Sequence, residues 1–243
     1  MKLARPVPMW QQVADHVRDQ ILNGTYQPGQ PLPSEEALSA EFGVSRPTIR
    51  EGIKTLASEG LVEVSRPRGT IVRDPLGRPP RTEQHTTASI GDQDDWADLG
   101  EPAFYRANAT ADQADLLAVP AGEPLLVRAV IQQSGGLRRA SRLYLPFSVA
   151  EHTPWADNPR LPPAGQLYDH FRVADHRLSW TDHVRARMPI GDETADLQAP
   201  SGVPLLVILR LTHTASGRDG ALALALEEIR HRADQVELAY PVP

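Results

Sequence analysis

Residues 43–70 read GVSRPTIREGIKTLASEGLVEVSRPRGT, and this stretch decides how the first part of the chain folds. Ser45 is a good helix N-cap, and the proline two residues later is tolerated in a first turn. Three apolar residues follow at helical spacing: Ile49, Ile53 and Leu56. Gly60 ends the pattern, so the sequence predicts one amphipathic helix between Ser45 and Gly60.

The end of the same stretch predicts a small β-hairpin. LVEV (61–64) and GTIV (69–72) have the composition of strands. The tight connection between them, SRPRG, carries Arg66 and Arg68. We therefore expect the helix to be followed by a short hairpin with a basic tip.

Two further helices are expected before this stretch. Residues 8–23 place five apolar side chains at helical spacing: Trp10, Val13, Val17, Ile21 and Leu22. Residues 34–43 begin with Ser34 as an N-cap, continue with two glutamates suited to a first turn, and end at Gly43. Three helices followed by a hairpin predict a winged helix-turn-helix.

The composition sets wider limits. A chain of 243 residues, 40% of them hydrophobic, is long enough for two domains. It has no cysteine, which excludes disulfides and thiolate zinc sites. The first ten residues lack the apolar core of a signal peptide, and no run of about 18 apolar residues occurs, so we expect a soluble, cytoplasmic protein with no membrane partner. The net charge is −6, but residues 1–80 are about neutral, so DNA binding there would need positive charges on one face.

The order of composition along the chain predicts three parts. Residues 1–75 would form the winged helix-turn-helix. Residues 76–100 lose all periodicity and are rich in Pro, Gly, Thr and Asp, which indicates a linker. Residues 101–243 would form the second domain.

The second domain contains an internal repeat. DLLAVPAGEPLLVRAV (115–130) and ADLQAPSGVPLLVILR (195–210) share two prolines, a glycine and the LLV segment at a constant offset of 80. Each copy predicts a short helix, a turn and an apolar strand that leads into a hairpin, and Thr110 with Gln113 predicts a capping box before the first copy. The fold class expected is α+β, an antiparallel sheet with helices.

The predicted recognition helix carries the residues suited to reading DNA. Four polar residues lie at or near its N-terminal end, away from the apolar stripe: Ser45, Arg46, Thr48 and Arg50. That end of a recognition helix reaches base edges in the major groove, where arginine bonds bidentately to guanine. Arg66 and Arg68 at the hairpin tip are placed to contact the minor groove or phosphates. The expected partner is a double-stranded DNA operator.

The segment PGQPLPSEEALSAEFGVSRPTIREGIKTLASEGLVEVSRPRGTIV (28–72) resembles the winged-helix domain of GntR-type transcription regulators. The resemblance implies a dimer that reads a pseudo-palindromic operator, with Arg46, Thr48 and Arg50 at the bases and Gly69 shaping the wing. The family often has an arginine that contacts DNA where this chain has Glu36. An acid there is expected to repel phosphate and change operator sequence or affinity.

The second domain resembles the UTRA effector-binding domain of the HutC branch, which is similar in fold to chorismate lyase. The resemblance rests on PAGEPLLVRAV (120–130), YLP (144–146), GQLYDHF (165–171) and RHRADQVELAY (230–240). In sugar-phosphate sensors of this branch, Arg-x-Arg and Ser-Leu-Tyr hold the phosphate, and the corresponding residues here are Arg128-Ala-Val130 and Gln166-Leu-Tyr168. Loss of one arginine and the serine disfavours a phosphorylated effector and suits a less charged, more apolar one.

Five residues are the candidates for contact with the effector: Arg128, Arg142, Tyr144, Tyr168 and Glu228. An alternative is that both arginines pair with acids at sheet edges and that Tyr168 belongs to the core. A second alternative is a C-terminal domain that only dimerises the protein and binds no ligand.

An enzyme is the third alternative, because the fold resemblance is to a lyase. Histidines, acids and arginines cluster at His176, Asp182, His183, Arg185 and Arg187. On a strand, however, Asp182 points away from the other strand residues, and the chain has no HExxH, nucleophile elbow or phosphate-binding glycine loop. We therefore expect no catalysis, no metal site and no cofactor. The function expected is a ligand-responsive repressor that binds its operator as a homodimer.

Overall fold

The structure, a computed structural model, describes residues 7–65, 68–74, 81–84, 96–174, 177–214 and 222–239. These residues form two compact units. One contains the helices and strands up to Asp74, and the other contains those from residue 81 onward.

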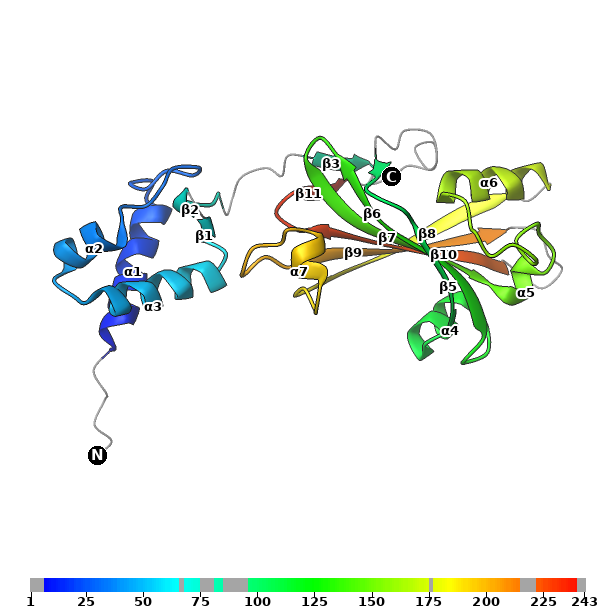
Figure 1. The fold of residues 1–243 in the computed structure, drawn as a ribbon, viewed down its shortest axis with the longest axis horizontal. Coiled ribbons are helices and arrows are strands. Elements are labelled where there is room, and N and C mark those ends of the chain that lie inside the picture. Colours follow the sequence, from blue (N-terminus) through cyan, green and yellow to red (C-terminus); the bar gives the residue numbers. More distant parts are fainter. Residues whose placement is uncertain are drawn as a thin grey trace, which may run out of the picture. The chain divides into compact units, whose positions relative to one another are not determined.

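The N-terminal unit is a winged helix-turn-helix, as the sequence predicts (Figure 1). Its elements are α1 (Met9–Leu22), α2 (Glu35–Phe42), α3 (Arg46–Ser58), β1 (Val62–Ser65) and β2 (Gly69–Val72), in that order. The two strands form an antiparallel hairpin. All three helices bury one face in a single apolar core, in which Ile49 and Leu56 of α3 have no exposed surface.

The predicted helix ends are confirmed. The Ser34 side chain accepts a hydrogen bond from the Ala37 N–H at the start of α2, and the Ser45 side chain accepts one from the Thr48 N–H at the start of α3. Gly43 ends α2 in the left-handed conformation, with φ of 65°. A residue without a Cβ adopts this conformation readily, so the chain can turn directly from α2 into the N-cap of α3.

The C-terminal unit is built on a seven-stranded antiparallel sheet. Its strands are β4 (Ala97–Asp98), β5 (Ala103–Asn108), β6 (Pro124–Ser134), β7 (Leu137–Pro146), β8 (Leu178–Arg187), β9 (Leu205–Thr214) and β10 (Leu222–Arg232). The order across the sheet is β4-β6-β7-β10-β9-β8, and β5 also pairs with β6. Separately, β11 (Val236–Ala239) pairs in parallel with β3 (Arg81–Gln84).

The internal repeat is visible in the backbone. Its copies are α4 (Ala111–Leu117) with β6, and α7 (Glu193–Asp196) with β9. After each helix a residue other than glycine adopts a left-handed conformation, Ala118 with φ of 52° and Gln198 with φ of 51°. Each repeat strand pairs with the next strand of its hairpin, and these partners, β7 and β10, pair with each other at the centre of the sheet. The predicted capping box at Thr110 and Gln113 is also present.

Helices cover both faces of the sheet (Figure 1). On one face, which we call the α6 face, α5 (Phe147–Ala150) and α6 (Ala164–Val173) share an apolar core with β6, β7 and β10. On the other, which we call the α7 face, α4 and the segment that follows α7 pack against alternate residues of the sheet. The sheet therefore presents two chemically separate surfaces.

The structure differs from the sequence analysis at residues 76–100, which are expected to form a linker. Residues 75–80 and 85–95 of this region lie outside the described residues, but β3 and β4 both fall within it. β4 pairs with β6, and β3 pairs with β11 near the C-terminus. Part of this stretch thus belongs to the sheets of the C-terminal unit, and strands of two and four residues are too short to produce a recognisable periodicity.

Candidate DNA-binding surface and ligand pockets

Four of the predicted DNA-binding residues gather at the start of α3. Ser45, Arg46 and Arg50 are exposed, Thr48 is partly exposed, and Ile49 between them is buried in the core. The Ser45 and Thr48 hydroxyl oxygens lie 2.9 Å apart, in addition to the cap hydrogen bond. The N-terminus of α3 therefore presents two guanidinium groups and two hydroxyls to solvent.

Both arginines are paired with glutamates from the first turn of α2. Arg46 Nη2 lies 2.9 Å from Glu36 Oε1, and Arg50 Nε donates to Glu35 Oε2 at 2.8 Å. The arginine side chains remain 53% and 66% exposed, respectively. Glu36, which was expected to face DNA phosphates, instead pairs with Arg46. The ion pairs offset the charges of Arg46 and Arg50 while both guanidinium groups stay exposed.

The wing contributes a different kind of arginine. Arg68 is exposed beside Gly69, whose φ of 85° requires the left-handed conformation that favours glycine. Among the described residues, no carboxylate forms an ion pair with Arg68. Arg66, the other predicted wing residue, lies outside the described residues.

The structure places the five candidate effector residues on opposite sides of the sheet. Arg128 and Tyr168 lie on the α6 face. Arg142, Tyr144 and Glu228 lie on the α7 face. Successive residues of a strand point to opposite faces, so these five residues belong to two sites.

The α6 face holds a cavity of about 400 Å³, which we call the α6-face pocket. Asp98 binds Arg128 on one side and accepts a hydrogen bond from Gln132 Nε2 at 2.9 Å on the other. Gln132 Oε1 in turn accepts from Arg139 Nε at 2.7 Å, and the Arg139 guanidinium lies 4.7 Å from the centroid of the Trp96 ring. Both arginines of the pocket thus have partners within its own wall.

The opposite wall of the α6-face pocket comes from the start of α6 and includes Gln166 and Asp169. Glu227 lies at its base, and the buried Tyr168 hydroxyl donates to Glu227 Oε2 at 3.1 Å. Burial, with the nearby Glu227 as a second cause, raises the pKa of Tyr168 well above its ordinary value, so the phenol keeps its proton. Glu228, the glutamate predicted from the sequence to bind the effector, does not line this pocket, whereas its neighbour Glu227 does.

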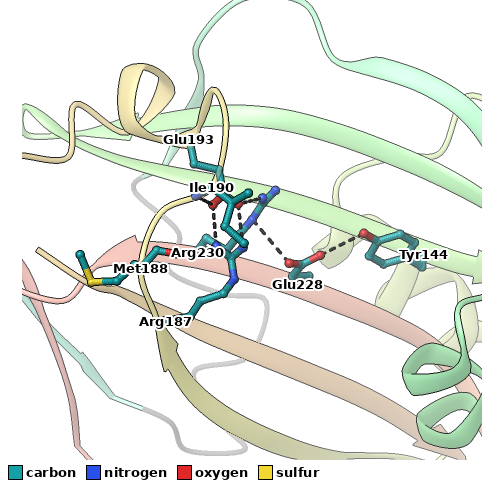
Figure 2. Close-up of polar contacts among 7 residues, drawn as sticks. All are labelled: Tyr144, Arg187, Met188, Ile190, Glu193, Glu228 and Arg230. Carbon is teal, nitrogen blue, oxygen red and sulfur yellow. Dashed lines mark hydrogen bonds and ion pairs between the residues drawn. The ribbon is translucent and has the colours of Figure 1, made fainter.

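The α7 face holds a second cavity, of about 600 Å³, above a chain of polar contacts that Figure 2 shows. Glu193 of α7 accepts two hydrogen bonds from Arg187, at 2.6 and 2.7 Å, and a third contact from Arg230. Glu228 lies 3.6 Å from Arg230 and accepts a hydrogen bond from the Tyr144 hydroxyl at 3.0 Å. We call this cavity the α7-face pocket.

These contacts shift the pKa values of Glu193 and Tyr144. Hydrogen bonds from Arg187, and to a smaller extent from the Ile190 N–H and Arg230, lower the pKa of Glu193 to about 2. Burial first, and Glu228 second, raise the pKa of Tyr144 above its ordinary value. The glutamate is therefore a stable anion that clamps two arginines, and Tyr144 is a neutral hydrogen-bond donor.

Known proteins resemble both units of the chain. The profile of the family described as "Bacterial regulatory proteins, gntR family" matches residues 10–72. An uncharacterised HTH-type transcriptional regulator of Streptomyces coelicolor is 32% identical over 247 residues, which cover 88% of this chain and 87% of the relative. The chain belongs to the GntR family. The HTH-type transcriptional repressor NagR of Bacillus subtilis is 41% identical over 70 residues, 29% of each chain.

A solved GntR-family structure has the same architecture. A crystal structure described as a GntR-family transcriptional regulator matches with a TM-score of 0.62 and 26% identity, over 97% of this chain and 98% of that chain. This GntR-family protein thus combines an N-terminal helix-turn-helix domain with a C-terminal antiparallel sheet domain. GntR regulators bind DNA operators and effector ligands.

The cluster considered for catalysis is divided in this GntR-family protein. Asp182 pairs with Arg210 at 2.9 Å, whereas Arg185 pairs with Asp112 of α4 at 3.0 Å and Arg187 with Glu193, so the predicted opposite orientation along β8 is confirmed. His176 lies outside the described residues. In the described ranges, no group of three His, Cys, Asp or Glu side chains could hold a metal ion. No helix among those same residues combines the length and apolar character needed to cross a bilayer.

Proposed function

We propose that this protein is a transcriptional repressor of the HutC branch, that it binds a pseudo-palindromic operator as a homodimer, and that an effector in its UTRA-like C-terminal domain controls this binding. The observation that carries the proposal is the N-terminus of α3, where Ser45, Arg46, Thr48 and Arg50 gather beside the turn from α2. In helix-turn-helix proteins this end of the helix reads base edges, and dimers bind two half-sites in successive grooves. The assignment as a repressor draws on the likeness to the repressor NagR.

The ion pairs of α3 are compatible with DNA reading because they are exposed. An exposed ion pair contributes only about 0–1 kcal/mol, whereas a bidentate arginine–guanine contact contributes about 1–3 kcal/mol of discrimination. Arg46 and Arg50 can therefore leave Glu36 and Glu35 when a matching base is present. Where no such base is present, the acids keep the surface neutral and limit attraction to phosphates.

The proposed effector site is the α6-face pocket. It contains Arg128 and Gln166, the residues that correspond to the phosphate-binding positions of sugar-phosphate sensors, and its volume of about 400 Å³ is within the range of small-molecule sites. Arg128 is already bound to Asp98, and Asp169 and Glu227 also line the cavity. A phosphate would meet repulsion there, so the proposed effector is uncharged and polar, with room for an apolar part.

The proposal is tested with the full chain and its own upstream DNA, by fluorescence anisotropy at fixed salt with a panel of neutral and phosphorylated metabolites. We expect two chains to bind each duplex and a neutral compound to change the affinity for DNA. This response to the compound is expected to be weaker in Glu227→Gln and unchanged in the surface control Arg106→Gln. An affinity indifferent to every compound would support the alternative of a C-terminal domain that only dimerises. A response limited to phosphorylated compounds would contradict the proposed pocket chemistry.

A further inference from the structure

The α7-face pocket lies on the opposite side of the sheet from the proposed effector site and has a chemistry of its own. Its floor is formed by β6, β7 and β10, and the segment around α7 forms one wall (Figure 2). Three arginines line it: Arg142, Arg187 and Arg230. Which of them is available to a ligand depends on the partners that each already has.

Two of the three arginines are occupied. Glu193 binds both Arg187 and Arg230, and Glu228 forms a further ion pair with Arg230 at 3.6 Å. The Arg230 side chain is 5% exposed, so its charge needs these carboxylates to be stable in the interior. Arg187 and Arg230 therefore hold α7 on the sheet and are not free to bind an anion.

Arg142 is different. It is partly buried in the middle of β7, between Ala140 and Tyr144 on the same face, and it lines the cavity. No carboxylate of the described residues forms an ion pair with it. Its one side-chain hydrogen bond shown there is to the Tyr144 hydroxyl, which in turn donates to Glu228. A guanidinium has five N–H donors, so most of the donors of Arg142 are available to a carboxylate placed in the cavity.

The outer part of the cavity has the opposite charge. Glu101, Asp192 and Asp196 line it and are exposed, and the lining also includes the apolar residues Ile131 of β6 and Leu197, which follows α7. A simple anion would have to pass this acidic rim. A molecule with a carboxylate at one end, a short apolar middle and a cation at the other end would satisfy both regions.

We propose that the α7-face pocket is a second ligand site, which binds a small organic zwitterion with its carboxylate on Arg142 and its ammonium group among Asp192, Asp196 and Glu101. This site is independent of DNA binding and of the proposed effector pocket, so it can be tested by ligand binding alone.

The test is isothermal titration of the full chain with three six-carbon probes: 6-aminohexanoate, hexanoate and hexylamine. We expect saturable one-site binding of 6-aminohexanoate, and at least about tenfold weaker binding of the two probes that lack one charge. Arg142→Gln is expected to abolish binding of 6-aminohexanoate, and Arg142→Lys to retain part of it because the charge remains. Arg106→Gln, which removes an exposed arginine of β5 outside the cavity, serves as the matched control.

A second variant tests the acidic rim of the cavity and leaves the residues of the sheet unchanged. Asp192→Asn changes an exposed side chain at the rim, so the fold is not at risk. It is expected to weaken 6-aminohexanoate several-fold and to leave hexanoate unchanged or slightly tighter. Absence of binding by 6-aminohexanoate at about 10 mM, or equal binding by wild type and Arg142→Gln, would overturn the proposal.

Discussion

Both units of the chain pair arginines with glutamates, but the pairs differ in exposure. In the N-terminal unit the side chains of Arg46 and Glu36 are 53% and 78% exposed, and in the C-terminal unit those of Arg230 and Glu193 are 5% and 13% exposed. An exposed pair contributes about 0–1 kcal/mol, whereas removal of one partner from a buried pair costs about 3–5 kcal/mol. The same chemical pair is therefore exchangeable in the first unit and structural in the second.

This difference explains how arginines can serve two purposes in one acidic chain. An arginine that reads DNA has to leave its resting partner at low cost, and solvent exposure provides that. An arginine that holds a helix on a sheet has to keep its partner, and burial enforces it.

The largest effect is expected for Glu193→Ala. The variant leaves Arg187 and Arg230 without their shared carboxylate, so the free energy of unfolding is expected to fall by about 3–5 kcal/mol. Urea unfolding followed by tryptophan fluorescence measures this, since Trp96, Trp155 and Trp180 lie in the C-terminal unit and Trp10 lies in the N-terminal unit. In the matched exposed variant, Glu36→Ala, we expect a loss below about 1 kcal/mol. Equal losses of unfolding free energy in the two variants would contradict the proposed difference between exposed and buried ion pairs.

Next in size is the effect of Arg46→Ala or Arg50→Ala on DNA binding. Each is expected to weaken operator binding by about 1–3 kcal/mol and to relax specificity at one base position, with little change in unfolding. Anisotropy titrations against operator duplexes with single base changes measure both. Arg106→Ala in the C-terminal unit is the control for loss of one positive charge. If neither α3 variant altered binding, the docking of α3 on DNA would be wrong.

A smaller effect is expected from pH. The pKa of Glu193 is lowered from its ordinary 4.5 to about 2, so folding favours its charged form. The resulting stabilisation is complete above about pH 4.5 and is lost as the pH falls towards 2, and it amounts to about 1–2 kcal/mol after allowance for solvent screening. Unfolding of the wild type between about pH 6 and pH 2 is therefore expected to depend more steeply on pH than that of Glu193→Gln. Identical pH dependence of unfolding in the wild type and Glu193→Gln would contradict the stabilising role of the Glu193 carboxylate between Arg187 and Arg230.

The smallest effect is expected for Glu36→Gln. Removal of this acid frees Arg46 and reduces repulsion of phosphates, so binding to any duplex is expected to tighten about two- to five-fold, with a steeper dependence on salt. The unfolding free energy is expected to stay within about 0.5 kcal/mol. Weaker binding by Glu36→Gln would mean that the glutamate itself contacts the operator.

Local signals in the sequence predict the helices well. The caps at Ser34 and Ser45 and the capping box at Thr110 depend on neighbours a few positions apart, and all are confirmed. The pairing of Arg46 with Glu36 depends instead on how α2 and α3 pack, which no local pattern specifies.

The division of the ligand-site candidates could not be read from the sequence for a similar reason. Alternation along β7 shows that Arg142 and Tyr144 share a face, but whether Arg128 of β6 joins them depends on the pairing of the two strands. A shift of one residue in the register of β6 against β7 would move Arg128 to the opposite face of the sheet. In the structure Arg128 pairs with Leu143, which places it on the α6 face. The irregular pairing of β10 near Ala223 and Ala225 adds to the ambiguity between Glu227 and Glu228.

The central claim is that the exposed N-terminus of α3 reads operator sequence. The most direct measurement compares the affinity of the full chain for its own upstream DNA with that for a scrambled duplex of the same length and composition, at one salt concentration. We expect the affinity for the upstream DNA to exceed that for the scrambled duplex at least about 10³-fold, and this ratio to fall in Arg46→Ala and Arg50→Ala. Equal affinities for the two duplexes would contradict it.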